Sequence, residues 1–245
     1  MDFTYDSYLK LLGLLKEKGY HFCDYLTCDT CEKPVIIRHD IDSSLDKAIE
    51  IARLENSKKI SSTFFVLLAT DFYNIFSRKS YEAITEIMAL GHQIGLHFDE
   101  KRYNISNEEE LKFWVQRESE VVSYALNKEV KVVSMHRPSR VILENDIQFD
   151  GIINSYSKKF LFDFKYLSDS RMHWREDVID AVKSNKFNKL HILTHPFWYS
   201  ETKQAMQEKL YHFIGEANKE RYFNLRENIT NFHEIINEGE LFHGN

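Results

Sequence analysis

The chain has 245 residues, 38 of them acidic and 32 basic, which gives a net charge of −6. This length can bury a sizeable core, and we expect a single catalytic domain over residues 1–245. The acidic balance argues against a nucleic-acid partner, no run of about 18 apolar residues predicts a membrane span, and the opening "MDFTYDSYLK" lacks the pattern of a secretory signal, so we expect a cytoplasmic protein.

Predicted helices and strands alternate along the chain. Apolar periodicity and capping residues predict helices at 4–18, 45–55, 78–90, 106–126 and 177–184, and a mostly helical segment after 201. Strands are predicted at 35–39, 62–68, 92–97, 130–135 and 190–194, with weaker patterns at 151–156 and 165–168. Ser43 or Ser44 can cap the second helix, and Ser106 with Glu109 forms a capping box for the fourth. The alternation predicts an α/β fold with a mainly parallel sheet, which is an open sheet or a barrel.

The only cysteines are Cys23, Cys28 and Cys31, clustered near the N-terminus. An odd number in one cluster is not a disulfide framework. Their spacing matches part of a plant-type iron–sulfur pattern, but the distant fourth cysteine is missing. His21 could complete a zinc site with them; reduced thiols in a loop or hairpin are the simpler interpretation.

Four predicted strands end in titratable side chains. These are Asp40 and Asp42 in "IIRHDID", His97 and Asp99 in "GLHFD", His136 and Arg137 in "VVSMHRP", and His195 in "HILTHPFW". Catalytic groups of α/β barrels gather at the carboxyl ends of strands, so we expect these side chains to form one site.

The residue types at these strand ends indicate the chemistry. Asp40 and Asp42 are two residues apart in an extended segment, so both project to one face, about 7 Å apart along the chain. One carboxylate can then bind a metal ion while the other takes a proton from water. Histidine and aspartate ligands with an open position are typical of a catalytic zinc or similar divalent ion. The pattern therefore predicts a metal-assisted hydrolase.

The motifs "RHDID", "GHQIGLHFD", "HRP", "KYLSDSRMHWRED" and "LTHP", in this order, resemble those of the polysaccharide deacetylase family, carbohydrate esterase family four. The resemblance covers about residues 33–200. It implies an irregular (β/α) barrel of about seven parallel strands and removal of an acetyl group from an N-acetylated sugar. Carried over by motif, it implies that Asp40 is the general base, His195 the general acid, and Asp42 and His97 ligands of a divalent metal, with zinc as the expected ion.

Three positions depart from the family pattern. Ile41 separates two aspartates that are usually adjacent, Lys101 stands where a second ligand histidine is usual, and His136 stands where arginine is usual. An ammonium has no lone pair for a metal, so three alternatives stay open: the third ligand is His136, which we prefer, it is Asp99, or the ion has no third protein ligand. The pattern resembles a divergent branch, similar to deacetylase-like proteins of bacterial surface-polysaccharide gene clusters. We expect the substrate to be a nucleotide- or lipid-linked sugar precursor.

The remaining site predictions concern the substrate pocket. Side chains expected to contact the sugar are Asp99, Arg137, Asp169, Trp174 and Trp198, with Tyr199 as a further candidate. Arg38 or Arg137 is expected to keep Asp40 ionised. Two alternative functions stay open: a non-catalytic sugar-binding relative, which Lys101 would favour, and a metal hydrolase of another C–N or amide bond.

Overall fold

The computed structural model describes residues 1–236, 238 and 239, and the chain divides into two compact units, Met1–Thr202 and Lys203–Asn245. The prediction of one catalytic domain over the whole chain stays a prediction. Within the described part of the chain, no helix combines the length and the apolar character needed to cross a membrane.

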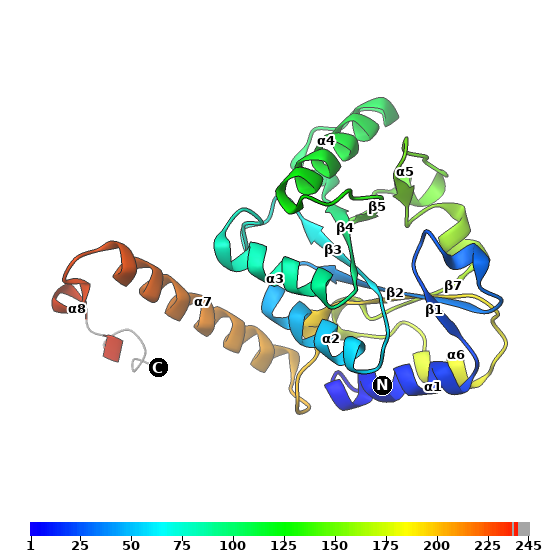
Figure 1. Cartoon of the computed structure of the whole chain (residues 1–245), viewed down its shortest axis with the longest axis horizontal. Coiled ribbons are helices and arrows are strands. Elements are labelled where there is room, and N and C mark those ends of the chain that lie inside the picture. Colours follow the sequence, from blue (N-terminus) through cyan, green and yellow to red (C-terminus); the bar gives the residue numbers. More distant parts are fainter. Residues whose placement is uncertain (237, 240–245) are drawn as a thin grey trace. The chain divides into compact units, whose positions relative to one another are not determined.

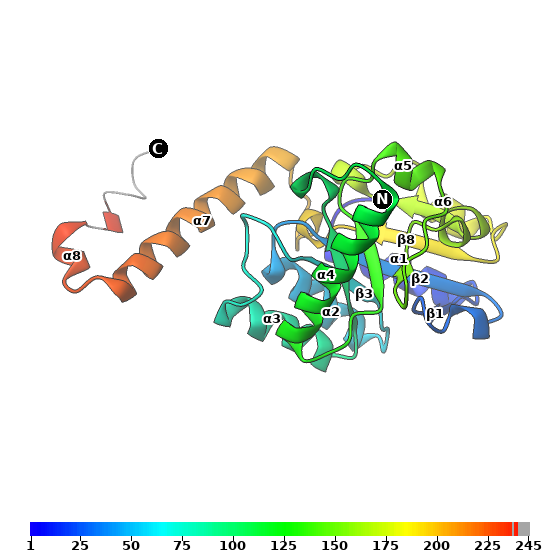
Figure 2. The same ribbon diagram turned by 90° about the horizontal axis from the view of Figure 1, so that it is seen from above.

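The first unit is built on one parallel sheet of eight strands, in the order β6-β5-β4-β3-β2-β8-β7, with β1 pairing beside β2 (Figure 1). The strands are β1 (His21–Cys23), β2 (Pro34–Ile41), β3 (Thr63–Leu67), β4 (Gln93–Phe98), β5 (Val132–Met135), β6 (Ile153–Asn154), β7 (Lys165–Ser168) and β8 (Leu190–Thr194). The sheet curls, with helices around its outer face (Figures 1 and 2). The predicted irregular (β/α) barrel of about seven parallel strands is confirmed.

The helices of this unit follow the predicted segments closely, except for the short helix α5, which was not predicted. They are α1 (Tyr5–Glu17), α2 (Leu45–Ser57), α3 (Arg78–Ala89), α4 (Glu108–Leu126), α5 (Arg140–Glu144) and α6 (Val178–Lys183). Ser44 caps α2 by accepting a hydrogen bond from the Lys47 amide. The N-cap of α4 lies one residue later than predicted, because Asn107 accepts from the Glu110 amide. The Glu110 carboxylate accepts from the amide of Ser106, the residue before the cap, so the predicted capping box is not formed.

The alternation of side chains along β2 explains how the core positions a site. Val35, Ile37 and Ile41 point to the face that packs under the helices and belong to the main hydrophobic core. Ile36 points to the opposite face, into a smaller cluster formed by Cys23, Tyr25, Cys28, Phe65, Val132, Phe160 and Phe164. By the same period of two, Arg38 and Asp40 follow Ile36 on the inner face of the curled sheet.

Gly95 of β4 is a position where any larger residue would collide with this inner cluster. A Cβ atom there would lie 2.6 Å from Cδ1 of Phe65 and closer still to Cε1 of the same ring. The Phe65 ring therefore occupies the space that a side chain at position 95 would take. His97, two residues later, has the next inward position on the strand.

The second unit contains α7 (Met206–Asn228) and α8 (Phe232–Ile235). Tyr222 and Phe232, one from each helix, are both buried, and their rings meet edge to face with centroids 5.2 Å apart. The predicted helical C-terminal segment is therefore present over these residues.

Candidate active site

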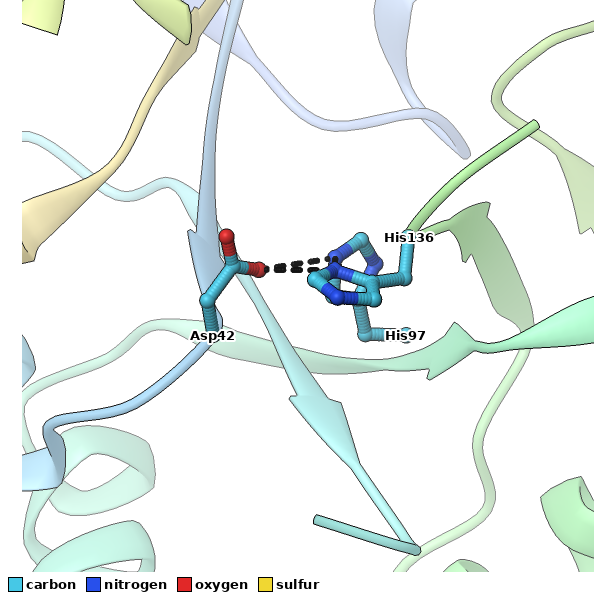
Figure 3. Close-up of side chains that lie close together, drawn as sticks. All are labelled: Asp42, His97 and His136. Atoms are coloured by element: carbon cyan, nitrogen blue, oxygen red, sulfur yellow. Dashed lines mark hydrogen bonds and ion pairs between the residues drawn. The ribbon is translucent and has the colours of Figure 1, made fainter. Parts of the chain in front are cut away.

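The carboxyl ends of β2, β4 and β5 bring Asp42, His97 and His136 together (Figure 3). Asp42 Oδ1 lies 3.2 Å from His97 Nε2 and 3.1 Å from His136 Nδ1, and the two ring nitrogens are 3.2 Å apart. Among the described residues, this is the one group of three or more histidine, cysteine or acidic side chains whose ligand atoms all lie within 4.8 Å of one another. The cysteine cluster does not meet that condition, and its three thiols are free.

The donor atoms of this group fit a divalent metal ion. Zinc bound tetrahedrally at about 2.0–2.1 Å places neighbouring ligand atoms roughly 3.3 Å apart. The three atoms here form a nearly equilateral triangle with edges of 3.1–3.2 Å. Two imidazole nitrogens and a carboxylate oxygen are also a donor set that zinc accepts, and three protein ligands leave a fourth position open.

Asp99, the alternative third ligand, makes a different contact. Its carboxylate forms a two-pronged ion pair with Arg137, in which Nε lies 3.2 Å from Oδ1 and Nη2 binds Oδ2. It also accepts a hydrogen bond from the Lys101 amide. The arrangement therefore favours His136 over Asp99 as the third ligand.

Asp40 is almost fully buried, and its two carboxylate oxygens have different surroundings. Oδ2 accepts a hydrogen bond of 2.8 Å from Arg38 and lies 3.7 Å from His97 Nε2. Oδ1 is buried without a hydrogen-bond partner among the described residues, although Asp40 lines the large cavity at the strand ends. Burial raises the pKa of Asp40, whereas the positive charges of Arg38 and His97 lower it. The lowering is the larger effect, so the pKa lies below its ordinary value and the carboxylate is ionised at neutral pH.

Arg38, rather than Arg137, is the arginine that holds Asp40. Its guanidinium is completely buried and donates also to Ser155 Oγ at 2.9 Å and to Tyr156 Oη at 3.2 Å. Ser155 and Tyr156 were not among the predicted site residues. No sequence motif marks them, because they follow the very short strand β6.

His195, directly after β8, is held by Asp169, directly after β7. Its Nδ1 lies 2.6 Å from Asp169 Oδ1, and its backbone amide donates to the same carboxylate. Tyr199 donates to the other oxygen, Oδ2, at 3.1 Å. Burial lowers the pKa of His195, but Asp169 and then Asp42 raise it, and the net pKa is about 9. Nε2 is the free ring nitrogen, and it lies 3.9 Å from Asp42 Oδ2.

A cavity of about 1390 Å³ opens at these strand ends. Arg137 and Trp198 of the predicted substrate residues line it, together with Asp40, Asp42, His136 and His195. Asp169 and Tyr199 are fully buried behind His195, and Trp174 is 8% exposed and belongs to the main core. The contacts of Asp169 are those of a residue that orients His195, a role the sequence did not indicate because the two lie 26 residues apart.

Comparison with known proteins identifies the fold. Neither protein-family models nor curated proteins give a match to the sequence. Among solved structures, a Streptococcus mutans CE4 esterase matches with a TM-score of 0.50 and 17% identity, covering 82% of this chain and 86% of that one. The chitin deacetylase of the fungal pathogen Colletotrichum lindemuthianum matches with a TM-score of 0.47 and 15% identity, covering 74% and 81%.

The chain spans less than two thirds of some other matched structures. Streptococcus pyogenes deacetylase PplD matches with a TM-score of 0.41 and 14% identity, covering 53% of this chain and 61% of that one. At these identities the likeness establishes the fold alone. The chain has the fold of the Streptococcus mutans CE4 esterase, so the resemblance seen in the motifs is confirmed at the level of the fold.

Proposed function

We propose that this protein is a metal-dependent hydrolase that removes the acetyl group from an N-acetylated sugar or sugar conjugate used in bacterial surface-polysaccharide biosynthesis. One observation carries the proposal. Three ligand atoms lie 3.1–3.2 Å apart, with an ionised carboxylate and a histidine–aspartate pair each within 4 Å of that group. Amide hydrolysis requires a place for the attacking water, a general base and a general acid, all close to one opening.

Asp42, His97 and His136 would hold the divalent ion, with zinc as the expected metal. The chemistry that such an ion supplies when bound is polarisation of an acyl oxygen and activation of water near neutral pH. The carboxylate and two neutral imidazoles leave one positive charge at the centre, which suits the negative charge that develops on the acyl oxygen during attack.

Asp40 is the proposed general base. Its unpaired Oδ1 accepts a proton from the attacking water while the water oxygen forms a bond to the acyl carbon. Arg38 holds Oδ2 at 2.8 Å and keeps the carboxylate ionised and fixed in orientation. Because the guanidinium is itself anchored by Ser155 and Tyr156, the base cannot turn away from the opening.

His195 is the proposed general acid. It carries a proton at Nε2 at neutral pH, since its pKa is about 9, and donates it to the sugar nitrogen as the C–N bond breaks. Asp169 fixes the ring by accepting from Nδ1, and Tyr199 fixes Asp169. The products are acetate and a free amino sugar. Arg137 and Trp198 on the cavity wall are the proposed contacts to the rest of the sugar.

The test is acetate release from a panel of N-acetylated sugars and sugar conjugates, with non-sugar acetamides included, by protein loaded with one equivalent of zinc. Turnover confined to sugar substrates and abolished by a chelator supports the proposal. Turnover only on non-sugar amides would make the protein a different C–N hydrolase. Stoichiometric zinc binding with no turnover on any compound would instead support a non-catalytic sugar-binding protein.

A further inference from the structure

The cavity at the strand ends has basic side chains that the proposed chemistry does not use. Lys101 lies on the turn after β4, and Arg171 and Arg175 lie on the segment after β7. All three are exposed and line the same cavity as Asp40 and His195. The whole chain has a net charge of −6, so a group of positive side chains around one opening is opposite in sign to the net charge of the protein.

The acidic side chains that line this cavity already have partners. Asp40 is paired with Arg38, and Asp42 contacts the two histidines. Glu100 accepts from the Ser139 amide, and Glu108 is paired with Lys112. By contrast, Lys101, Arg171 and Arg175 have no ion-paired carboxylate in the part of the chain that the structure describes. The cavity therefore offers positive charge that the protein itself does not neutralise.

The segment that carries the two arginines has an unusual backbone. Arg171 and Met172 both have positive φ angles, 58° and 55°, a conformation that non-glycine residues adopt at some energetic cost. This turn starts directly after Asp169, which holds His195. The fold thus keeps Arg171 at a strained turn two residues from the carboxylate that orients the proposed acid.

We propose that Arg171 and Arg175 bind a phosphate group of the substrate, so that the protein acts on an N-acetyl sugar whose anomeric oxygen carries a phosphate or diphosphate. This inference rests on the proposed deacetylase function and specifies its substrate class. Two guanidinium groups suit phosphate because each can donate two parallel hydrogen bonds to its oxygens. A cavity of about 1390 Å³ has room for a sugar with a further group attached through that phosphate.

The experiment compares two substrates that differ only in the phosphate: the methyl glycoside and the 1-phosphate of the same N-acetylhexosamine. Zinc-loaded wild-type protein is expected to have a KM for the 1-phosphate at least about tenfold lower, rising with salt concentration. The variant Arg171→Gln/Arg175→Gln should raise the KM for the 1-phosphate by about 10–100-fold, leave kcat nearly unchanged, and leave the methyl glycoside unaffected. Arg140→Gln, a change at an exposed arginine outside the cavity lining, is the matched control.

Two further substrates identify the source of the phosphate. A nucleoside-diphosphate sugar and a polyprenyl-diphosphate sugar in detergent micelles carry the same linkage, and the one with the lower KM identifies the natural carrier. Equal KM values for glycoside and 1-phosphate, or an equal loss on both in the double variant, would overturn the phosphate site while the deacetylase function stands. If no substrate is turned over, the deacetylase function fails, and calorimetric binding of the 1-phosphate, lost or kept in the double variant, decides the phosphate site alone.

Discussion

At the scale of single residues, we propose that two departures from the family pattern compensate each other. The resemblance places an arginine at position 136 and a ligand histidine at position 101, and this chain has His136 and Lys101 instead. His136 Nδ1 lies within 3.2 Å of Asp42 Oδ1 and His97 Nε2, and Arg38, from β2 itself, lies beside Asp40. We infer that Arg38 takes over the role of the usual arginine, which leaves position 136 free to supply the third ligand.

Metal content tests this exchange of roles directly. His136→Ala should lose most of its bound zinc after dialysis, because it removes one of three protein ligands. Asp99→Ala should keep its zinc, because Asp99 contacts Arg137 and not the ligand group. Elemental analysis of both variants checks the assignment, and zinc loss in the Asp99 variant alone would move the ligand role to that carboxylate.

Replacing the proposed base should separate turnover from metal binding. Asp40→Asn is expected to bind zinc normally and to lose about 10²–10⁴-fold in kcat on an accepted substrate. It should also unfold more easily, by up to about 3 kcal/mol, because Arg38 is completely buried and loses its charged partner. Acetate release, zinc content and urea unfolding are measured on one preparation, well below the unfolding midpoint. A kcat close to that of the wild type would contradict the assignment.

The sequence predicts residues at strand ends better than residues behind them. Asp40, Asp42, His97, His136 and His195 stand in short motifs. The parallel sheet brings four of them to one opening, and the fifth, His97, is buried and contacts Asp42 and His136. Their individual roles stay predictions. Residues that hold the site side chains from behind, such as Ser155 and Tyr156 around Arg38, depend on which strands become neighbours in the sheet. A local sequence pattern does not indicate which strands these are.

At the scale of elements, β4 depends on its glycine. Gly95→Ala would place a methyl group 2.6 Å from Cδ1 of Phe65 and 3.0 Å from the Val132 carbonyl oxygen. Phe65 is fully buried and cannot swing away freely, so we expect a loss of about 1–3 kcal/mol in the free energy of unfolding. Urea unfolding provides the measurement.

A second substitution shows whether the ring is the cause. In the Gly95→Ala/Phe65→Leu double variant, the smaller side chain removes the collision, so the two changes together should cost less than the sum of the two single changes. Gly13→Ala in α1 is a matched control, because a Cβ there meets nothing within 4 Å. Strict additivity of the two substitutions would contradict the steric explanation.

Periodicity identified the long elements and some of the short ones, including β6, β7 and α6. The five main strands and the helices other than α5 agree with the predicted segments. The five-residue helix α5 and the three-residue strand β1, which ends at Cys23, were not predicted. Strand β1 pairs in parallel with the start of β2, so Cys23 lies on a strand and not in a hairpin. Three residues are too few to show an alternating apolar pattern, and β1 is a strand because it pairs with β2.

At the scale of the whole molecule, the inner face of the sheet carries a buried histidine below the site. His191 is completely buried; its Nδ1 lies 3.0 Å from the Phe160 carbonyl oxygen and its Nε2 lies 2.7 Å from Tyr25 Oη. A neutral ring satisfies both contacts, since Nδ1–H donates to the carbonyl and Nε2 accepts from the tyrosine hydroxyl. A proton on Nε2 would place a charge in the core near Arg38 and would reverse the direction of the hydrogen bond to the tyrosine hydroxyl.

The stability of the molecule should therefore fall in mild acid. Burial, and then Arg38, lower the pKa of His191 from 6.5 to about 3 in the folded protein. As the pH falls below 6.5 the unfolded chain binds a proton that the folded protein does not, so this contribution to stability is complete above 6.5 and is lost on acidification. The slope approaches about 1.4 kcal/mol per pH unit, or about 2 kcal/mol lost by pH 5. The lowered pKa of His92 acts in the same direction. The raised pKa of His195, about 9, acts in the opposite direction, because the folded protein then binds a proton before the unfolded chain does. Urea unfolding of chelator-treated protein between pH 7 and pH 5 measures the slope. In His191→Gln the slope should be markedly smaller, whatever its stability at pH 7, and an unchanged slope would show that other groups control the acid sensitivity.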